Sequence, residues 1–188
     1  MILPVYLYGH PVLRQQTEDV TENSEKLQKL ISDMWETMYH SDGVGLAAPQ
    51  VGESLSVVVI DGSGTAEKFP ECKDSKMTLI NPYLEVIDDV EPVTRDEGCL
   101  SLPGMSEPVK RTEHIRLQWL DENFESHEQE FSGFLSRIIQ HEYDHLEGMV
   151  YTDRISALRR QMARGKLLNI AKGKVDCDYR VKAAPKLK

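Results

Sequence analysis

The sequence has few cysteines, and no two of them stand at the CxxC spacing. Cys72, Cys99 and Cys177 are odd in number and lie far apart along the chain. This arrangement argues against a disulfide framework and favours a reducing compartment. The first residues also lack the basic segment and the long apolar run of an export signal. We therefore expect a cytoplasmic protein.

Long hydrophobic runs are missing as well, because no apolar stretch approaches the roughly 20 residues that a membrane-spanning helix needs. No internal repeat, low-complexity tract or Gly/Ser-rich linker divides the chain. The 188 residues are 40% hydrophobic and 28% charged, which is the composition of a globular protein. We expect one domain over residues 1–172 and a basic C-terminal tail over residues 173–188.

Charge is spread unevenly along the chain. Residues 1–148 carry 11 Lys and Arg against 28 Asp and Glu, whereas residues 149–188 carry 11 against 3. A basic segment on an acidic body predicts a polyanionic partner for that segment. The alternative is a solvated helix face.

The periodicity of apolar residues indicates helices at both ends of a group of strands. Helical spacing appears in three segments: 23–39, with Asn23 or Ser24 as N-cap, 132–147, ended by Gly148, and 156–172, stopped by Gly173. Strand patterns appear in four segments: 55–61, 77–88, around 90–94, and 114–121. The polar segment 68–76 is predicted to be a surface loop. This order of elements predicts an α+β fold.

The pattern HExxH occurs as HEYDH at residues 141–145, inside a predicted helix. Residues at positions i and i+4 share one face of a helix, so His141 and His145 can reach one metal ion, and Glu142 stands beside the first ligand. Phe134 and Ile138 lie on the same face, which indicates that the histidines point inward. The alternative is a pair of surface histidines on an acidic helix.

A hydrolytic metal site needs a third protein ligand and an open position. Tyr151 stands where the pattern HExxHxxGxxH has its last histidine, and no His or Glu follows residue 148. The aspartates that follow lie among basic residues, which offer each of them an ion pair. Cys99, in the segment EGCLSLP, is the better candidate because a thiolate is a good ligand for divalent transition metals. The alternative is an ordinary buried thiol.

The segment GVGLAAPQVG, residues 43–52, contains the GxGxxA pattern of dinucleotide-binding proteins. A predicted helix precedes it, where that fingerprint requires a strand, and Pro49 lies where the following helix would need backbone donors. We therefore favour a loop of small residues that lets a peptide backbone approach closely, with Gln50 as an amide donor.

Together, the segments GVGLAAPQVG, EGCLSLP and QHEYDHLEG resemble the three signature motifs of peptide deformylases. Their order and spacing match, as does YGHPVLR near the N-terminus, and the resemblance covers roughly residues 4–155. It implies an α+β fold with the HExxH pattern on a central helix surrounded by antiparallel sheets. It also implies that residues 1–172 remove the N-formyl group from the initiator methionine of newly made proteins and release formate.

By matching position, the resemblance implies that Cys99, His141 and His145 hold one divalent metal ion. This ion is commonly Fe²⁺ in the family, and Zn²⁺, Ni²⁺ or Co²⁺ can substitute for it. Glu142 would be the general acid and base. This assignment agrees with general chemistry, because a metal ion lowers the pKa of water toward about 7 and an adjacent carboxylate can take the proton.

The resemblance also implies the groups that hold the substrate. Gln50 and the backbone N–H of Leu100 would stabilise the developing oxyanion, and Gly45 would pair with the substrate backbone. Methionine selectivity needs an apolar slot, for which the candidates are Val44, Phe134 and Ile138; their alternative is ordinary core packing. The family often has a branched apolar residue where this chain has Arg95. The resemblance therefore does not predict which residues form the rim of the pocket.

Glu97 is predicted either to orient a metal-ligand imidazole or to pair with Arg111. An exposed ion pair is the alternative.

Two other functions remain open from the residues alone: a zinc endopeptidase that does not need Cys99, and a non-catalytic module with a structural metal. For the deformylase, we expect formyl-Met nascent peptides as substrates and neither DNA nor a membrane as a partner. The basic C-terminal segment predicts docking to the ribosome through the following residues and their neighbours: Arg159, Arg160, Arg164 and Lys166.

Overall fold

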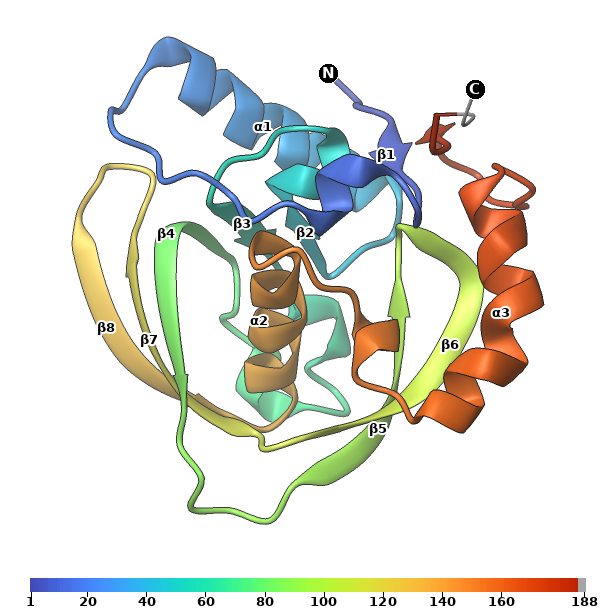
Figure 1. The fold of residues 1–188 in the computed structure, drawn as a ribbon. Helices are drawn as coiled ribbons and strands as arrows, with labels where there is room; N and C mark the ends of the chain where they lie inside the picture. The colour runs from blue at the N-terminus through green and yellow to red at the C-terminus, as the bar shows by residue number, and fades with distance from the viewer. Residues whose placement is uncertain (186–188) are drawn as a thin grey trace.

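The computed structural model describes residues 1–185, which form an α+β protein as predicted (Figure 1). In this part of the chain the helices are α1 (Glu25–His40), α2 (Gly133–Leu146) and α3 (Ala157–Ala171). The strands are β1 (Val5–Tyr6), β2 (Gly45–Ala47), β3 (Val57–Ile60), β4 (Met77–Val86), β5 (Val93–Cys99), β6 (Leu102–Arg111), β7 (His114–Leu120), β8 (Ser126–Ser132) and β9 (Val181–Lys182). The last residues of the predicted tail, 186–188, lie outside the described residues.

The strands form two antiparallel sheets and one parallel pair. The larger sheet has the order β2-β3-β4-β7-β8, and each neighbouring pair in it is antiparallel. Strands β5 and β6 form a separate antiparallel hairpin. Strands β1 and β9 pair in parallel, so the last described strand lies beside the first (Figure 1). Helix α2 packs against β2, β3 and β8, and the side chain of Arg137 in α2 donates to the Val109 carbonyl in β6 at 2.9 Å.

Helix α1 forms because it combines an N-cap with an apolar stripe. The Ser24 hydroxyl accepts a hydrogen bond from the Leu27 backbone N–H at 3.2 Å, which satisfies one of the donors that a helix start leaves open. Leu27, Ile31 and Met34 are buried in the core beneath the larger sheet. Of the two N-caps that the sequence allowed, Ser24 is therefore the one used, and the predicted helix is confirmed.

The segment 68–76 is partly built into the fold, so the prediction of a surface loop was incomplete. Cys72 and Ser75 are fully buried. The Glu71 carboxylate accepts a hydrogen bond from the Phe134 backbone N–H at 2.7 Å, in the first turn of α2. A negative charge is favourable at a helix N-terminus because of the helix dipole. This segment therefore caps the helix that carries the HExxH pattern.

Helix α3 lies on the outside of the β5–β6 hairpin, as Figure 1 shows. A narrow stripe of Ala163, Leu167 and Ile170 is buried, and most of the remaining helix surface is exposed. The chain leaves the helix at Gly173, whose φ of 75° is in the left-handed region. Among the described helices, none is both long enough and apolar enough to cross a membrane.

Candidate active site

The candidate metal ligands come from the end of a strand and from one face of a helix. Cys99 is the last residue of β5, and His141 and His145 stand one turn apart on α2. The Cys99 Sγ and His145 Nε2 atoms lie 3.3 Å apart. One ligand atom from each of the three residues lies within 4.8 Å of the others. Their separation fits three donors around one ion.

The chemistry of these donors also fits a divalent transition metal, which prefers thiolate and neutral imidazole. Burial lowers the pKa of His145 well below its ordinary value, so this imidazole stays neutral and can bind a metal. The Nδ1 atom of His141 bonds to the Glu97 carboxylate at 2.9 Å, which directs its Nε2 atom toward the other ligands.

Glu142 lies beside these ligands in a buried and crowded position. Its side chain is 5% exposed, and its Oε2 atom has no hydrogen-bond partner within residues 1–185. Burial raises the pKa of Glu142 to about 7. A Cβ atom at Gly45 would lie 2.5 Å from the Glu142 Oε1 atom, so any larger residue there would displace this carboxylate. The close approach of β2 to α2 fixes the place of this carboxylate.

The amide of Gln50 is fixed by hydrogen bonds at both of its ends. Gln50 belongs to a short 3-10 turn that follows β2 and is 1% exposed. Its Oε1 atom accepts from the Ala47 N–H at 2.9 Å. Its Nε2 atom lies 3.4 Å from the Cys99 Sγ atom and 3.2 Å from the Ser101 hydroxyl. The amide donor therefore points at the tip of the β5–β6 hairpin, where Leu100 also lies.

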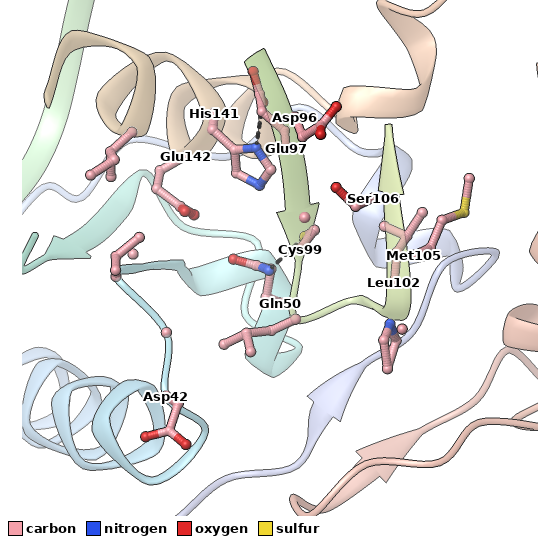
Figure 2. A pocket seen from close by; sticks show the side chains of 18 of the residues that line it. Asp42, Gln50, Asp96, Glu97, Cys99, Leu102, Met105, Ser106, His141 and Glu142 are labelled. Carbon is pink, nitrogen blue, oxygen red and sulfur yellow. Dashed lines mark hydrogen bonds and ion pairs between the residues drawn. The ribbon is translucent and has the colours of Figure 1, made fainter. Parts of the chain in front are cut away.

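These side chains surround a cavity of about 560 Å³ (Figure 2). The sequence-predicted residues that line it are Val44, Gly45, Gln50, Cys99, Leu100, Phe134, Ile138, His141 and Glu142. His145 is 1% exposed and lies outside this lining, beside Cys99. The structure thus brings residues from three separate segments to one place.

The sequence matches the model of the polypeptide deformylase family over residues 2–161, in agreement with this geometry. The chain belongs to the peptide deformylase family. Members are metal-dependent hydrolases that remove the N-formyl group from nascent proteins, and this is the activity of the chain.

Relatives of the deformylase cover nearly the whole chain. The peptide deformylase of Christiangramia forsetii is 42% identical, over 97% of this chain and 96% of its own. That of Salinibacter ruber is 44% identical, over 95% and 93%. The crystal structure of a peptide deformylase from Legionella pneumophila has a TM-score of 0.80 and 36% identity, over 93% of this chain and 98% of its own.

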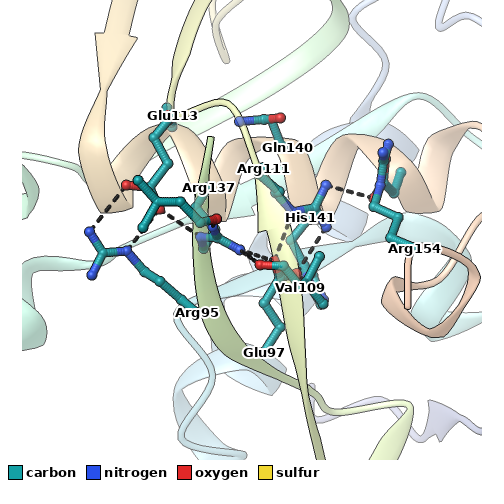
Figure 3. Close-up of polar contacts among 12 residues, drawn as sticks. Arg95, Glu97, Val109, Arg111, Glu113, Arg137, Gln140, His141 and Arg154 are labelled. Carbon is teal, nitrogen blue, oxygen red and sulfur yellow. Dashed lines mark hydrogen bonds and ion pairs between the residues drawn. The ribbon is translucent and has the colours of Figure 1, made fainter. Parts of the chain in front are cut away.

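A network of buried ion pairs stands behind the candidate metal ligands of the deformylase (Figure 3). Arg111 pairs with Glu97 at 2.7 Å and with Asp144 at 3.0 Å, and Arg137 pairs with Glu97 at 2.7 Å. Burial alone would raise the pKa of Glu97, but the bonds from Arg111 and His141 outweigh it and hold that pKa well below its ordinary value. Both roles expected for Glu97 are therefore present, and the exposed ion pair is not.

Arg95 does not line the cavity. Its guanidinium pairs with Glu113 at 2.8 Å and lies over the ring of Phe69. Phe69 in turn stacks on Phe134, with ring centroids 4.1 Å apart. Arg95 is linked to two residues that do line the cavity: to Phe134 through Phe69, and to Arg137 through Glu113.

Among the lining residues that the sequence did not predict are three from one further segment, Asp176, Cys177 and Tyr179. They come from the segment after α3, which the sequence predicts to be a basic tail. The only local signal was the alternation of charged residues with Val175, Cys177 and Tyr179, which is typical of an extended segment with one face on the protein.

Proposed function

We propose that this deformylase binds one divalent ion through Cys99, His141 and His145, and that Glu142 moves the proton during hydrolysis of formylmethionine. The observation that carries the proposal is the convergence of these four side chains, with the Glu142 Oε2 atom unpartnered in the described chain. We propose Fe²⁺ as the ion, with Zn²⁺, Ni²⁺ or Co²⁺ as substitutes, since all of these accept thiolate and imidazole. The HExxH helix would then be the central helix of the site.

When bound, the ion would supply a Lewis acid of the kind that makes water nucleophilic near neutral pH. Glu142 takes a proton from the attacking water as its oxygen bonds to the formyl carbon. Glu142 then gives that proton to the amine nitrogen as the C–N bond breaks, so that formate and a free N-terminus are released. A pKa of about 7 suits both transfers, because neither protonation state is costly at neutral pH.

The oxyanion that develops on the formyl oxygen needs donors held in place before the reaction. We propose the Gln50 Nε2 atom and the Leu100 backbone N–H. The bond between the Gln50 Oε1 atom and the Ala47 N–H keeps the amide from rotating. This arrangement needs no reorganisation when the negative charge appears.

We propose that the substrate chain lies along the free edge of β2. The Val44 carbonyl accepts from the Asp61 N–H at 2.9 Å, on the side of β3, whereas the Ala47 N–H turns to Gln50. In an antiparallel strand, the N–H and C=O groups of successive residues point alternately toward and away from the neighbouring strand. The N–H and C=O of Gly45 therefore face away from β3. The methionine side chain would pack against the apolar wall of the cavity that Val44, Phe134 and Ile138 form.

A formate-release assay tests the proposed function. The protein is purified without metal, loaded anaerobically with Fe²⁺ or in air with Ni²⁺, and given a formyl-Met-Ala-Ser peptide. We expect formate to appear in step with free amine, and the internal peptide bonds to stay intact. Absence of formate from protein that holds one metal ion per chain would end the proposal.

Replacing Gln50 with alanine is expected to lower kcat by about 10²- to 10³-fold, which is the usual cost of one oxyanion donor. The change also leaves the Ala47 N–H without its partner, so a loss of thermal stability is expected. Gln140→Ala is the matched control, because Gln140 is also buried, lies outside the cavity lining and donates to the Thr112 carbonyl. Equal kcat in the two variants would contradict the role of Gln50.

We propose that the exposed basic face of α3 docks the deformylase near ribosomal RNA in the cytoplasm. Arg160 and Arg164 are exposed on this helix. Phosphate contacts of such side chains weaken steeply as salt rises. The proposed boundary between the catalytic domain, 1–172, and the basic tail, 173–188, lies at the end of α3, and residues 174–180 of the tail pack back against the domain.

Reversing two of these charges, Arg160→Glu with Arg164→Glu, is expected to weaken co-sedimentation with ribosomes at low salt and to leave kcat on short peptides unchanged. The control is Lys26→Glu with Lys73→Glu, which makes the same change in net charge at exposed positions elsewhere. Equal co-sedimentation of both double variants would refute the docking face.

A further inference from the structure

Residues 174–180 form an extended segment that is tied to the body at both ends. Every second side chain faces the protein: Val175, Cys177 and Tyr179. At the start of the segment, the Lys174 N–H donates to the Asn169 carbonyl at 2.9 Å. At its end, the Arg180 carbonyl accepts from the Val5 N–H at 2.8 Å, next to the β1–β9 pair. The segment is therefore a fixed part of the fold.

This segment closes one side of the active-site cavity, and Tyr179 reaches the hairpin tip. The Tyr179 hydroxyl donates to the Leu100 carbonyl at 2.8 Å. Burial raises the pKa of Tyr179, so the hydroxyl keeps its proton and remains a donor. The bond therefore joins the C-terminal segment to the residue whose N–H is the proposed oxyanion donor.

The hairpin tip, Leu100–Ser101, is held by groups from three distant parts of the chain. The Ser101 carbonyl accepts from the Tyr8 N–H at 2.8 Å, and the Ser101 hydroxyl lies 3.2 Å from the Gln50 amide nitrogen. These bonds fix Ser101, which is fully buried. Leu100 is only partly buried, and Tyr179 holds its carbonyl. The Leu100 carbonyl lies in the peptide plane shared with Ser101, whereas the Leu100 N–H lies in the preceding plane, shared with Cys99. The two planes meet at the Leu100 Cα atom, so fixing the carbonyl limits the φ and ψ angles of Leu100 and with them the directions open to its N–H.

We propose that Tyr179 is a positioning residue for catalysis, which acts by fixing the backbone of Leu100 at the hairpin tip. The proposal rests on the proposed function, because it assigns the oxyanion donor that Tyr179 serves. It places part of the catalytic geometry in the C-terminal segment, outside the three motif segments.

Tyr179→Phe tests this proposal, since the ring keeps its packing and only the hydroxyl is lost. In the full-length, Ni²⁺-loaded enzyme with a formyl-Met-Ala-Ser peptide, we expect kcat to fall about ten-fold, part of the cost of a lost donor, while KM changes less than two-fold. In the Zn²⁺-loaded protein, we expect the Leu100 amide resonance to shift and its hydrogen exchange to quicken. Tyr39→Phe is the control, because it removes a tyrosine bond to Asp61 of 2.7 Å at an exposed site.

A wild-type kcat in Tyr179→Phe, or a Leu100 amide no more altered than in Tyr39→Phe, overturns the proposal. A rise in KM with kcat unchanged also overturns it, because the segment would then only bind substrate. Failure of the proposed function is distinguishable from these results: the metal-loaded wild type would itself release no formate, while the Leu100 amide would still report on Tyr179.

Discussion

Glu142→Gln is expected to lower kcat for formate release by about 10²- to 10⁴-fold, the usual contribution of a general acid and base. Glutamine has nearly the same shape as glutamate, so it fits in the narrow space beside Gly45. It cannot take a proton from water or return one to the amine. The metal content of the variant should remain that of the wild type, because Glu142 is not among the candidate ligands.

The control for this variant is Glu147→Gln, which removes an exposed carboxylate just after the same helix. We expect it to keep full activity. Metal content is measured by mass spectrometry of the purified proteins and kcat by the formate assay. A Glu142→Gln variant with wild-type kcat would show that another group moves the proton. A variant that lost its metal would instead place Glu142 among the ligands.

Cys99→Ala is expected to abolish both stoichiometric metal binding and activity. The change leaves two imidazoles as protein ligands, and a hydrolytic site of this kind needs three. Without the ion, the pKa of water stays near its bulk value of about 16 and no nucleophile is available at neutral pH. Titration of apo protein with Zn²⁺, followed by calorimetry, would show the loss of affinity directly.

Cys72→Ala provides the matched control, because Cys72 is a free thiol that is fully buried in the core between the larger sheet and α2. It should bind one metal ion and keep its activity, with a modest loss of thermal stability from the small cavity. Full metal content and activity in Cys99→Ala would favour an endopeptidase-like site that does not use the thiol.

The candidate site could be predicted well from the sequence where its geometry is local. The i and i+4 spacing of His141 and His145 dictates a shared helix face. Gln50 and Cys99 could be placed near that face only through the family motifs, since their contact joins segments about fifty residues apart. Their bond is a property of the tertiary fold.

Other parts of the fold gave no readable signal. Strand β8, with the sequence SHEQEFS, is an edge strand whose side chains are mostly exposed, so it has too few apolar residues to show alternation. Strand β6 contains Pro103 and Pro108, which argue against a strand in any sequence-based prediction. The cap that Glu71 provides for α2 depends on a contact between residues 63 positions apart.

The pairing of β1 with β9 sets the order in which this deformylase can be assembled. The side chains of Tyr6 and Lys182, in the two strands, bond across 176 positions of sequence. Closing so long a loop is entropically costly and slow, so contacts of this range form late in folding. During synthesis, β1 cannot pair with β9 until β9 has left the ribosome. Cys177 and Tyr179 lie just before β9, so the wall they form is among the last parts of the active site to be built.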